Sequence, residues 1–339
     1  MKKKLFILSF TAMTISSLSL FAQSNYKIVN KIHVEGEGGW DYISVDEVNG
    51  RIFASHATVA QAVDIKTGKL AGTITDTKGI HGIAIANDLN KGFTSNGRDS
   101  SVTVFNLKTL EVITKVKITG RNPDAILYDP FSQKVFTFNG GSSNSTVIDA
   151  KENKVLATIP LDGKPEFSVT DGKGKIYVNI EDKSLINQIN ATTLKVEQHW
   201  PIAPGEEPSG LALDNKTHRL FSVCGNKLMV VTDAETGKVI TTLPIGDRCD
   251  GVTFDPDKKR AYSSNGDGTI TVVQEENSNS FKVLETIQTQ LGARTITIDK
   301  TTHHLYLPTA EYESAPSGSN RRPPIKPNSF VILDIETLK

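Results

Sequence analysis

The chain has 339 residues, and its 38 lysines and arginines equal its 38 aspartates and glutamates, so the formal net charge at pH 7 is zero. A neutral chain gives no electrostatic reason to expect nucleic acid or an anionic membrane as the main partner. Beyond the N-terminus no stretch approaches the roughly 20 apolar residues that a membrane-spanning helix needs, so we expect no membrane span.

Residues 1–22 have the composition of a cleaved secretory signal. Lys2, Lys3 and Lys4 precede a run of apolar and hydroxyl residues that leads to the small residue Ala22. No cysteine follows this run, which argues against a lipoprotein anchor. We therefore expect a mature chain of residues 23–339 that is periplasmic or secreted. Removing the signal takes away three lysines and no acid, which leaves 35 basic against 38 acidic side chains.

The rest of the chain repeats one unit seven times. The starts of the units align as GGWDYISVD, GIHGIAIAN, RNPDAILYD, GKPEFSVTD, EEPSGLALD, DRCDGVTFD and LGARTITID. The position of Asp41 in this alignment recurs at intervals of 40, 43, 42, 43, 41 and 44 residues. Each start is followed by a second short apolar segment such as RIFASH or KGFTSN, then by a third segment, a turn and a fourth segment.

Four short alternating strands in a unit of this length are typical of one propeller blade. The sequence therefore predicts an all-β fold, a seven-bladed β-propeller with four antiparallel strands per blade. The last unit stops at VILDIETLK, its third strand and turn, without a fourth strand, whereas residues 27–36 match the fourth strand at 154–163 position by position. We expect this N-terminal strand to complete the last blade and to remove two exposed sheet edges.

Two motifs resemble the YVTN-type propeller repeat: the glycine-to-proline lead-ins GRNPDA, GKPEF and GEEPSG, and the D-x-x-T-G-K-V turn from Asp233 to Val239. Over all seven units the chain resembles the YncE-like family of exported bacterial proteins. The resemblance implies a propeller that works outside the cytoplasm. It implies little about chemistry, because related propellers include binding modules, lactonases and lyases. The WD40 pattern fits less well, because Trp40-Asp41 begins a first strand, whereas that family's pair ends a third strand.

The first strands of a propeller line its central channel, so the aligned positions should form a ring at one mouth. We call these seven residues the mouth ring: Asp41, His81, Asp124, Glu166, Ser209, Asp250 and Arg294. Four carboxylates gathered in a narrow mouth raise one another's pKa values unless a positive charge joins them. That charge can come from Arg294, a bound cation or a cationic ligand. The alternative is that the acids only cap turns through their own backbone.

Carboxylates are the oxygen ligands that calcium and magnesium prefer. By analogy with lactonases and lyases on this fold, Asp124, Glu166 and Asp250 are candidate metal ligands and His81 a candidate acid or base. Adding His81 and His56 would widen the choice to zinc or manganese.

A second ring of residues ends the second strands, and the sequence predicts that it faces the mouth ring: His56, Asn96, Asn139, Asn179, Cys224, Asn265 and Thr309. The recurring asparagines favour turn chemistry over ligand binding, whereas His56 stays a candidate for ligand binding. Arg98 and Glu181, in turns after second strands, belong to the same face and are further candidates.

Two features of this face stay open. Cys224 and Cys249 lie at the mouth of adjacent blades, where a disulfide, two free thiols or a soft metal ligand at Cys224 are all compatible with the sequence. Residues 310–329, with adjacent Arg321 and Arg322, form a long irregular segment between the second and third strands of the last unit. Such a segment is either a lid or docking loop over the mouth or a disordered insertion.

The first functional hypothesis is an exported binding propeller that engages a small molecule or a protein at the acidic mouth. The second is a divalent-metal-dependent hydrolase or lyase of the lactonase kind that uses the same channel. The third, single-stranded DNA binding, is a role proposed within the YncE-like family, and the charge balance of this chain does not support it.

Overall fold

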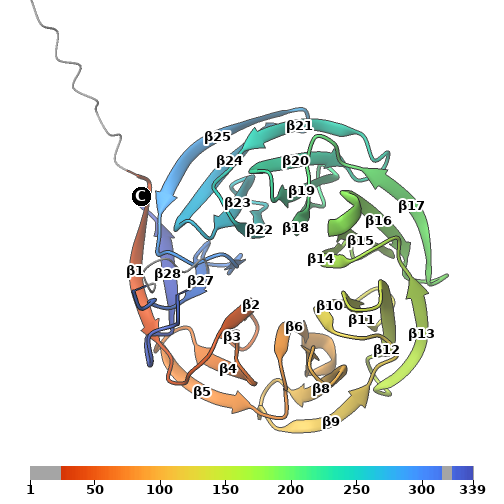
Figure 1. Cartoon of the computed structure of the whole chain (residues 1–339), viewed down its shortest axis with the longest axis vertical. Coiled ribbons are helices and arrows are strands. Elements are labelled where there is room, and N and C mark those ends of the chain that lie inside the picture. The colour runs from red at the N-terminus through yellow and green to blue at the C-terminus, as the bar shows by residue number, and fades with distance from the viewer. Residues whose placement is uncertain (1–23, 315–322, 339) are drawn as a thin grey trace, which may run out of the picture.

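The computed structural model describes residues 24–314 and 323–338. They form seven four-stranded antiparallel sheets arranged as blades around a central channel (Figure 1). The predicted fold class is therefore confirmed. The predicted signal at 1–22, Arg321 and Arg322 lie outside the described residues.

The first three blades follow the chain without interruption. Blade 1 consists of β2 (Trp40–Asp46), β3 (Arg51–His56), β4 (Val59–Asp64) and β5 (Lys69–Ile74). Blade 2 consists of β6 (Ile80–Ala86), β7 (Lys91–Asn96), β8 (Ser101–Asn106) and β9 (Val112–Lys117), with the 3-10 helix η1 (Asn87–Leu89) after β6. Blade 3 consists of β10 (Pro123–Asp129), β11 (Lys134–Asn139), β12 (Asn144–Asp149) and β13 (Lys154–Pro160).

Blades 4 to 6 repeat the same order. Blade 4 consists of β14 (Pro165–Thr170), β15 (Lys175–Ile180), β16 (Leu185–Asn190) and β17 (Lys195–Pro201), with the 3-10 helix η2 (Glu181–Lys183) after β15. Blade 5 consists of β18 (Pro208–Asp214), β19 (Arg219–Cys224), β20 (Leu228–Asp233) and β21 (Val239–Pro244). Blade 6 consists of β22 (Cys249–Asp255), β23 (Arg260–Asn265), β24 (Thr269–Asn277) and β25 (Ser280–Gln288).

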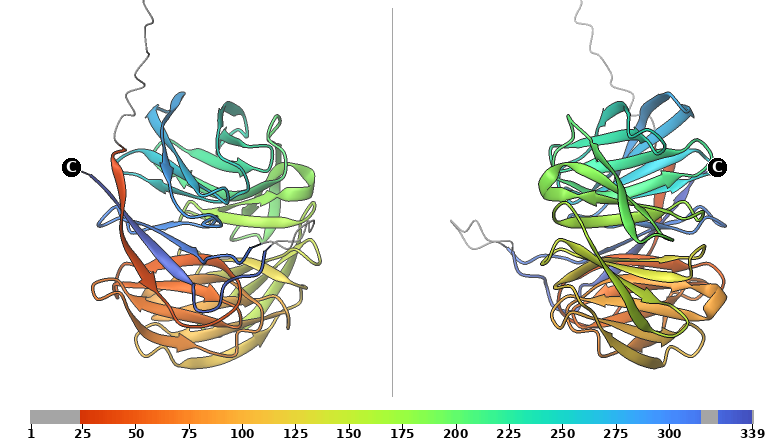
Figure 2. Two further views of the ribbon diagram at one scale, coloured as in Figure 1. Left: turned by 60° about the vertical axis from the view of Figure 1, so that its left-hand side comes forward. Right: turned by 90° about the vertical axis from the view of Figure 1, so that its right-hand side faces the viewer.

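Blade 7 joins the two ends of the chain. It consists of β26 (Thr297–Ile298), β27 (Leu305–Thr309), β28 (Val331–Thr337) and, as its outer strand, β1 (Tyr26–His33). β1 pairs antiparallel with β28 from Tyr26 opposite Thr337 to His33 opposite Val331, and Figure 2 shows the two strands side by side. The predicted closure by the N-terminal strand is confirmed, because the missing fourth strand is supplied from residues that lie more than 290 positions earlier.

The core lies between the blades, which explains the two kinds of strand pattern. Second and third strands are buried on both faces, as in β11 and β12, whereas fourth strands such as β13 alternate between exposed residues and half-buried or buried ones. Aromatic pairs connect neighbouring blades, for example Phe53 with Phe105 at a ring-centroid distance of 5.5 Å. A strand that is covered on both faces has a nearly continuous run of apolar residues, whereas in an outer strand apolar and polar residues alternate.

A bulge recurs near the beginning of the first strand in six blades. The register of β2 against β3 shifts between Trp40 and Ile43, and β6, β10, β14, β18 and β22 shift at the equivalent place. A bulge breaks the alternation of side chains between the two faces of a strand and re-aims the residues within it. The mouth-ring residues of these six blades lie in or beside these bulges.

Blade 7 departs from the expected pattern in two ways. Its first strand has only two residues, because the chain before it makes tight turns, with Ala293 N donating to Gln290 O and Arg294 N to Gly292 O. The described ends of segment 310–329 are also less irregular than expected. Glu313 N donates to Pro324 O and Lys326 N donates to Glu311 O, so the two ends run as a short antiparallel pair.

Among residues 24–314 and 323–338, no helix combines the length and the apolar composition that crossing a lipid bilayer requires.

The closure by β1 predicts unequal effects of two substitutions in the same strand. Ile32 is 4% exposed and packs with Ile52, Tyr306 and Ile332, whereas Val29 is 38% exposed. We expect Ile32→Ala to lower the free energy of unfolding by about 2 to 4 kcal/mol, because it leaves a cavity at the seam. Val29→Ala should change it by less than about 0.5 kcal/mol. Urea denaturation measures both, and equal effects would contradict a seam held by the buried face of β1.

Candidate functional site

The mouth ring is assembled by the first strands. Asp41, His81, Asp124, Glu166 and Asp250 come from β2, β6, β10, β14 and β22, and Arg294 precedes β26. Their side chains are largely shielded but reach solvent, from 9% exposed for Glu166 to 29% for His81. Contacts between several of them show that these candidates converge.

Arg294 of blade 7 forms ion pairs with acids of blade 6 and blade 1, where the two ends of the ring meet. Its Nε lies 2.6 Å from Asp250 Oδ2 and its Nη2 lies 3.4 Å from Asp41 Oδ1, and Nη2 also donates to the Trp40 carbonyl at 3.3 Å. Burial alone would lower the pKa of Arg294, but the charges of Asp250 and Asp41 raise it above its ordinary value. The guanidinium therefore stays charged and compensates these two acids.

His81 lies between two acids. Its Nδ1 is 2.6 Å from Asp41 Oδ2 and 3.8 Å from Asp124 Oδ1. Burial alone would lower the pKa of His81, but the hydrogen bond to Asp41 and the charge of Asp124 raise it above its ordinary value. The turn of Gly97 lies against the other side of the ring, where an added Cβ would come within 2.8 Å of Nε2.

Lys164 is a member of the site that the sequence reasoning missed. Its Nζ lies 2.8 Å from Glu166 Oε1 and also binds Glu181 Oε2, which is the contact that brings the predicted residue Glu181 to the mouth. Lys164 precedes the aligned slot by two positions, where the other blades carry no lysine, so the repeat gave no signal for it.

These positive charges do not fully compensate the acids. Burial, with the charge of Asp41, raises the pKa of Asp124 to about 6. Burial, with the charge of Asp124, raises the pKa of Glu166 to about 8 in spite of the contact with Lys164. Burial also raises the pKa of Asp250 although Arg294 opposes it. At neutral pH the mouth thus holds protons that a bound positive group would displace.

The geometry favours a different metal set from the one the sequence suggested. Among the described residues of the ring, the potential ligand atoms of Asp41, His81 and Asp124 lie within 4.8 Å of one another. Glu166 and Asp250 are instead engaged by Lys164 and Arg294. In this arrangement His81 would be a ligand and not the acid or base, and of the predicted ligands Asp124 alone belongs to the cluster.

His56 is not brought to the mouth ring. It is 2% exposed, its Nδ1 lies 2.8 Å from Gln61 Oε1, and its ring stacks on Phe330 at 4.1 Å between centroids. It lines a separate cavity of about 300 Å³ between residues 36–38 and 325–330.

The second ring does not face the mouth ring as expected, because its asparagines turn into the blades. Asn96 Nδ2 donates to Ser101 Oγ and Thr103 Oγ1 of its own blade, and Asn139 and Asn265 make the equivalent bonds. Asn179 Nδ2 donates to the carbonyls of Ser209 and Gly210 in the next blade. The interpretation of these asparagines as structural residues agrees with this arrangement.

The remaining candidates have simpler surroundings. Arg98 is exposed and has no ion-pair partner among the residues that the structure describes. Cys224 and Cys249 are both buried and free, and the Cys249 thiol donates to the Cys224 carbonyl at 3.1 Å. Burial raises the pKa of each thiol to about 12, so neither is a reactive thiolate at neutral pH.

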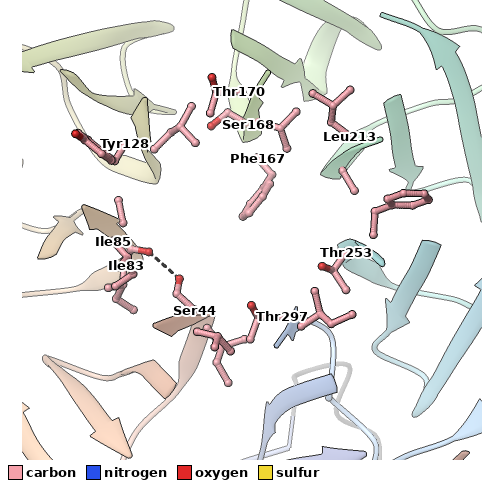
Figure 3. A pocket seen from close by; sticks show the side chains of 18 of the residues that line it. Ser44, Ile83, Ile85, Tyr128, Phe167, Ser168, Thr170, Leu213, Thr253 and Thr297 are labelled. Carbon is pink, nitrogen blue, oxygen red and sulfur yellow. Dashed lines mark hydrogen bonds between the residues drawn. The ribbon is translucent and has the colours of Figure 1, made fainter. Parts of the chain in front are cut away.

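Beyond the mouth the channel widens into a cavity of about 540 Å³. It is lined by apolar side chains from the middle and end of the first strands and by hydroxyls such as those of Ser44, Thr253 and Thr297, as Figure 3 shows. Phe167 projects into this space from β14. The acids of the mouth ring do not line the cavity, so the acidic entrance is distinct from an interior that mixes apolar side chains with hydroxyl and other polar groups.

Tyr42 is the second residue that the sequence reasoning missed. It follows Asp41 directly, so a regular strand would turn it away from the channel. The bulge in β2 instead lets Tyr42 pack on Phe167 of blade 4, with ring centroids 5.2 Å apart. The two rings meet between the mouth ring and the channel cavity.

Comparisons with known proteins identify the fold. No family model matches the chain, and no curated protein matches it in sequence. Solved structures with the same fold include hydrazine synthase of Kuenenia stuttgartiensis, with 16% identity, a TM-score of 0.69 and coverage of 81% of this chain and 94% of that chain. U3-55K has 9% identity, a TM-score of 0.76 and coverage of 91% and 98%. The WD40 repeats of RRP9 have 8% identity, a TM-score of 0.76 and coverage of 92% and 97%.

At these identities the likeness shows the propeller fold alone.

The position of His81 predicts that alanine substitutions at two equivalent glycines have different effects on the pKa of His81. Gly97→Ala should displace the imidazole, disrupt its hydrogen bond to Asp41 and bring the pKa of His81 down toward its ordinary value, because the added Cβ would meet Nε2 at 2.8 Å. Gly140→Ala is the matched control, since it occupies the same turn of the next blade and its Cβ would meet nothing closer than 3.7 Å. Proton NMR titration of His81 measures the pKa, and equal shifts in both variants would contradict the geometry.

Proposed function

We propose that this chain is an exported binding propeller of the YncE-like type whose ligand brings a positively charged group to the acidic mouth. The observation that carries the proposal is the charge of the mouth. The carboxylates of Asp41, Asp124, Glu166, Glu181 and Asp250 share three basic partners, His81, Lys164 and Arg294. When all eight groups are ionised, two negative charges lack a partner.

The raised pKa values support the same conclusion. A carboxyl whose pKa is raised by burial and by like charges binds a proton because no other positive charge is available. A cationic ligand takes the place of that proton, so it binds more tightly as the pH rises through the pKa values of about 6 for Asp124 and about 8 for Glu166.

Terbium ions test the site directly, because this hard cation binds carboxylate oxygens much as calcium does and emits when an aromatic ring nearby absorbs light. We expect saturable emission that depends on the mouth, with Tyr42 as the neighbouring aromatic ring. Asp124→Asn should weaken the binding by about tenfold, and the affinity should rise from pH 5.5 to pH 7.

The control is Asp257→Asn, which alters the group of Asp255, Asp257 and His303 outside the mouth ring and should leave the Asp124-dependent phase unchanged. Terbium binding that ignores Asp124 would contradict a cation-binding mouth.

The runner-up is a metal-dependent hydrolase or lyase in the same mouth. The observation in its favour is the cluster of Asp41, His81 and Asp124, which offers two carboxylates and an imidazole to one ion. Elemental analysis of the purified protein, before and after chelation, separates the two functions. A stoichiometric zinc, manganese or other divalent ion that Asp124→Asn abolishes favours the enzyme.

We also propose that the protein works in the periplasm or outside the cell, which rests on the signal-like residues 1–22. Expression of the whole chain in a Gram-negative host should yield a periplasmic product whose mass corresponds to residues 23–339. An uncleaved cytoplasmic product would contradict this proposal.

A further inference from the structure

The aromatic floor of the mouth comes from two blades that face each other across the channel. Tyr42 of blade 1 is 7% exposed and packs against Ala125 of blade 3 and Phe167 of blade 4. The equivalent positions of the other blades carry side chains too small to reach the centre: Gly82, Ala125, Gly210, Gly251 and Thr295. One tyrosine and one phenylalanine therefore form the floor below the carboxylates.

The Tyr42 side chain is largely buried, and its hydroxyl has no hydrogen-bond partner among the described residues. The hydrogen bond that Tyr42 does make uses its carbonyl, which accepts from Ser55 Oγ at 3.1 Å. Burial and the charges of Asp124, Asp41, Glu166 and Asp250 raise the pKa of Tyr42 well above its ordinary value, so the phenol stays protonated. A hydroxyl that lies near four acids and bonds to none of them is available to accept a hydrogen bond from a ligand.

The charge of the mouth sets the charge of that ligand. Arg294 engages Asp250 and Asp41, Lys164 engages Glu166 and Glu181, and Asp124 has only the 3.8 Å contact with His81. Asp124 is therefore the mouth-ring acid without a close basic partner among the described residues. An organic cation beside Asp124 can also pack on the rings of Tyr42 and Phe167, whose centroids lie 5.2 Å apart, and a bare metal ion cannot.

We infer that the mouth binds a primary organic amine, whose ammonium group donates to Asp124, Glu166 and the phenolic oxygen of Tyr42. An ammonium group carries three N–H donors, which equals the number of these acceptors. The carbon next to the nitrogen packs on the rings of Tyr42 and Phe167, where a cation is also attracted to the aromatic face. This inference rests on the proposed function of the mouth.

The test uses n-butylammonium chloride as the probe and the full mature chain at pH 7. Isothermal titration should give saturable binding that releases protons, because the ammonium displaces the proton of Glu166, and the heat should therefore depend on the ionisation enthalpy of the buffer. Tyr42→Phe, which removes only the hydroxyl, should weaken the affinity by about tenfold. Tyr128→Phe is the matched control, because its hydroxyl bonds to Asp88 away from the mouth, and it should bind the probe like the unchanged protein.

Butan-1-ol distinguishes charge from shape. Equal binding of butan-1-ol and butylammonium would overturn the inference, since the site would then select a neutral hydroxyl compound. Unchanged affinity in Tyr42→Phe, or no binding of butylammonium, would overturn it as well. Terbium binding that depends on Asp124, without butylammonium binding, would refute the amine and leave the cation-binding mouth in place. The absence of both would refute the proposed function too.

Discussion

The pairing of β1 with β28 is the constraint on which the rest of the molecule depends. Each blade buries both faces of its inner strands against its neighbours, so an open ring would expose two such faces at once. The seam also organises the mouth. Arg294 and Thr295 of blade 7 contact Asp41 and the backbone of Trp40 in blade 1, with Thr295 Oγ1 donating to the Asp41 carbonyl at 2.6 Å. Closure of the ring thus places the arginine that compensates Asp41 and Asp250.

The chemistry of the mouth follows from crowding acids inside this closed ring. Four blades each contribute a mouth-ring carboxylate to a space that is largely shielded from water, and burial penalises every ionised acid. His81, Lys164 and Arg294 reduce the penalty without removing it, so Asp124 and Glu166 hold protons at pH values where exposed acids have lost them. Such a mouth is prepared for a positive charge, and the unpaired hydroxyl of Tyr42 indicates where that charge would sit.

The repeat made much of this arrangement predictable. The regular recurrence of the aligned slot predicts the number of blades, the N-terminal closure and which acids share one ring, because these depend on the repeat. Side-chain directions within a bulge depend instead on a local break in periodicity, and for this reason Tyr42 could not be assigned to the channel from the alternation of β2. Lys164 was missed for a related reason, since it occurs in one blade. The asparagines of the second ring and His56 point into the protein and not toward the mouth, because buried polar groups there need them as hydrogen-bond partners.

The titration of Glu166 and Asp124 tests the central claim most directly. Carbon-13 NMR of side-chain carboxyl groups, assigned with Glu166→Gln and Asp124→Asn, follows each acid through the pH range in the protein without a ligand. If the acids of the mouth are not fully compensated, the titration midpoints should lie at pH values of about 8 for Glu166 and about 6 for Asp124. Midpoints at the ordinary values of 4.5 and 3.8 would show that Lys164, His81 and Arg294 already satisfy these acids, and would contradict a mouth prepared for a positively charged ligand.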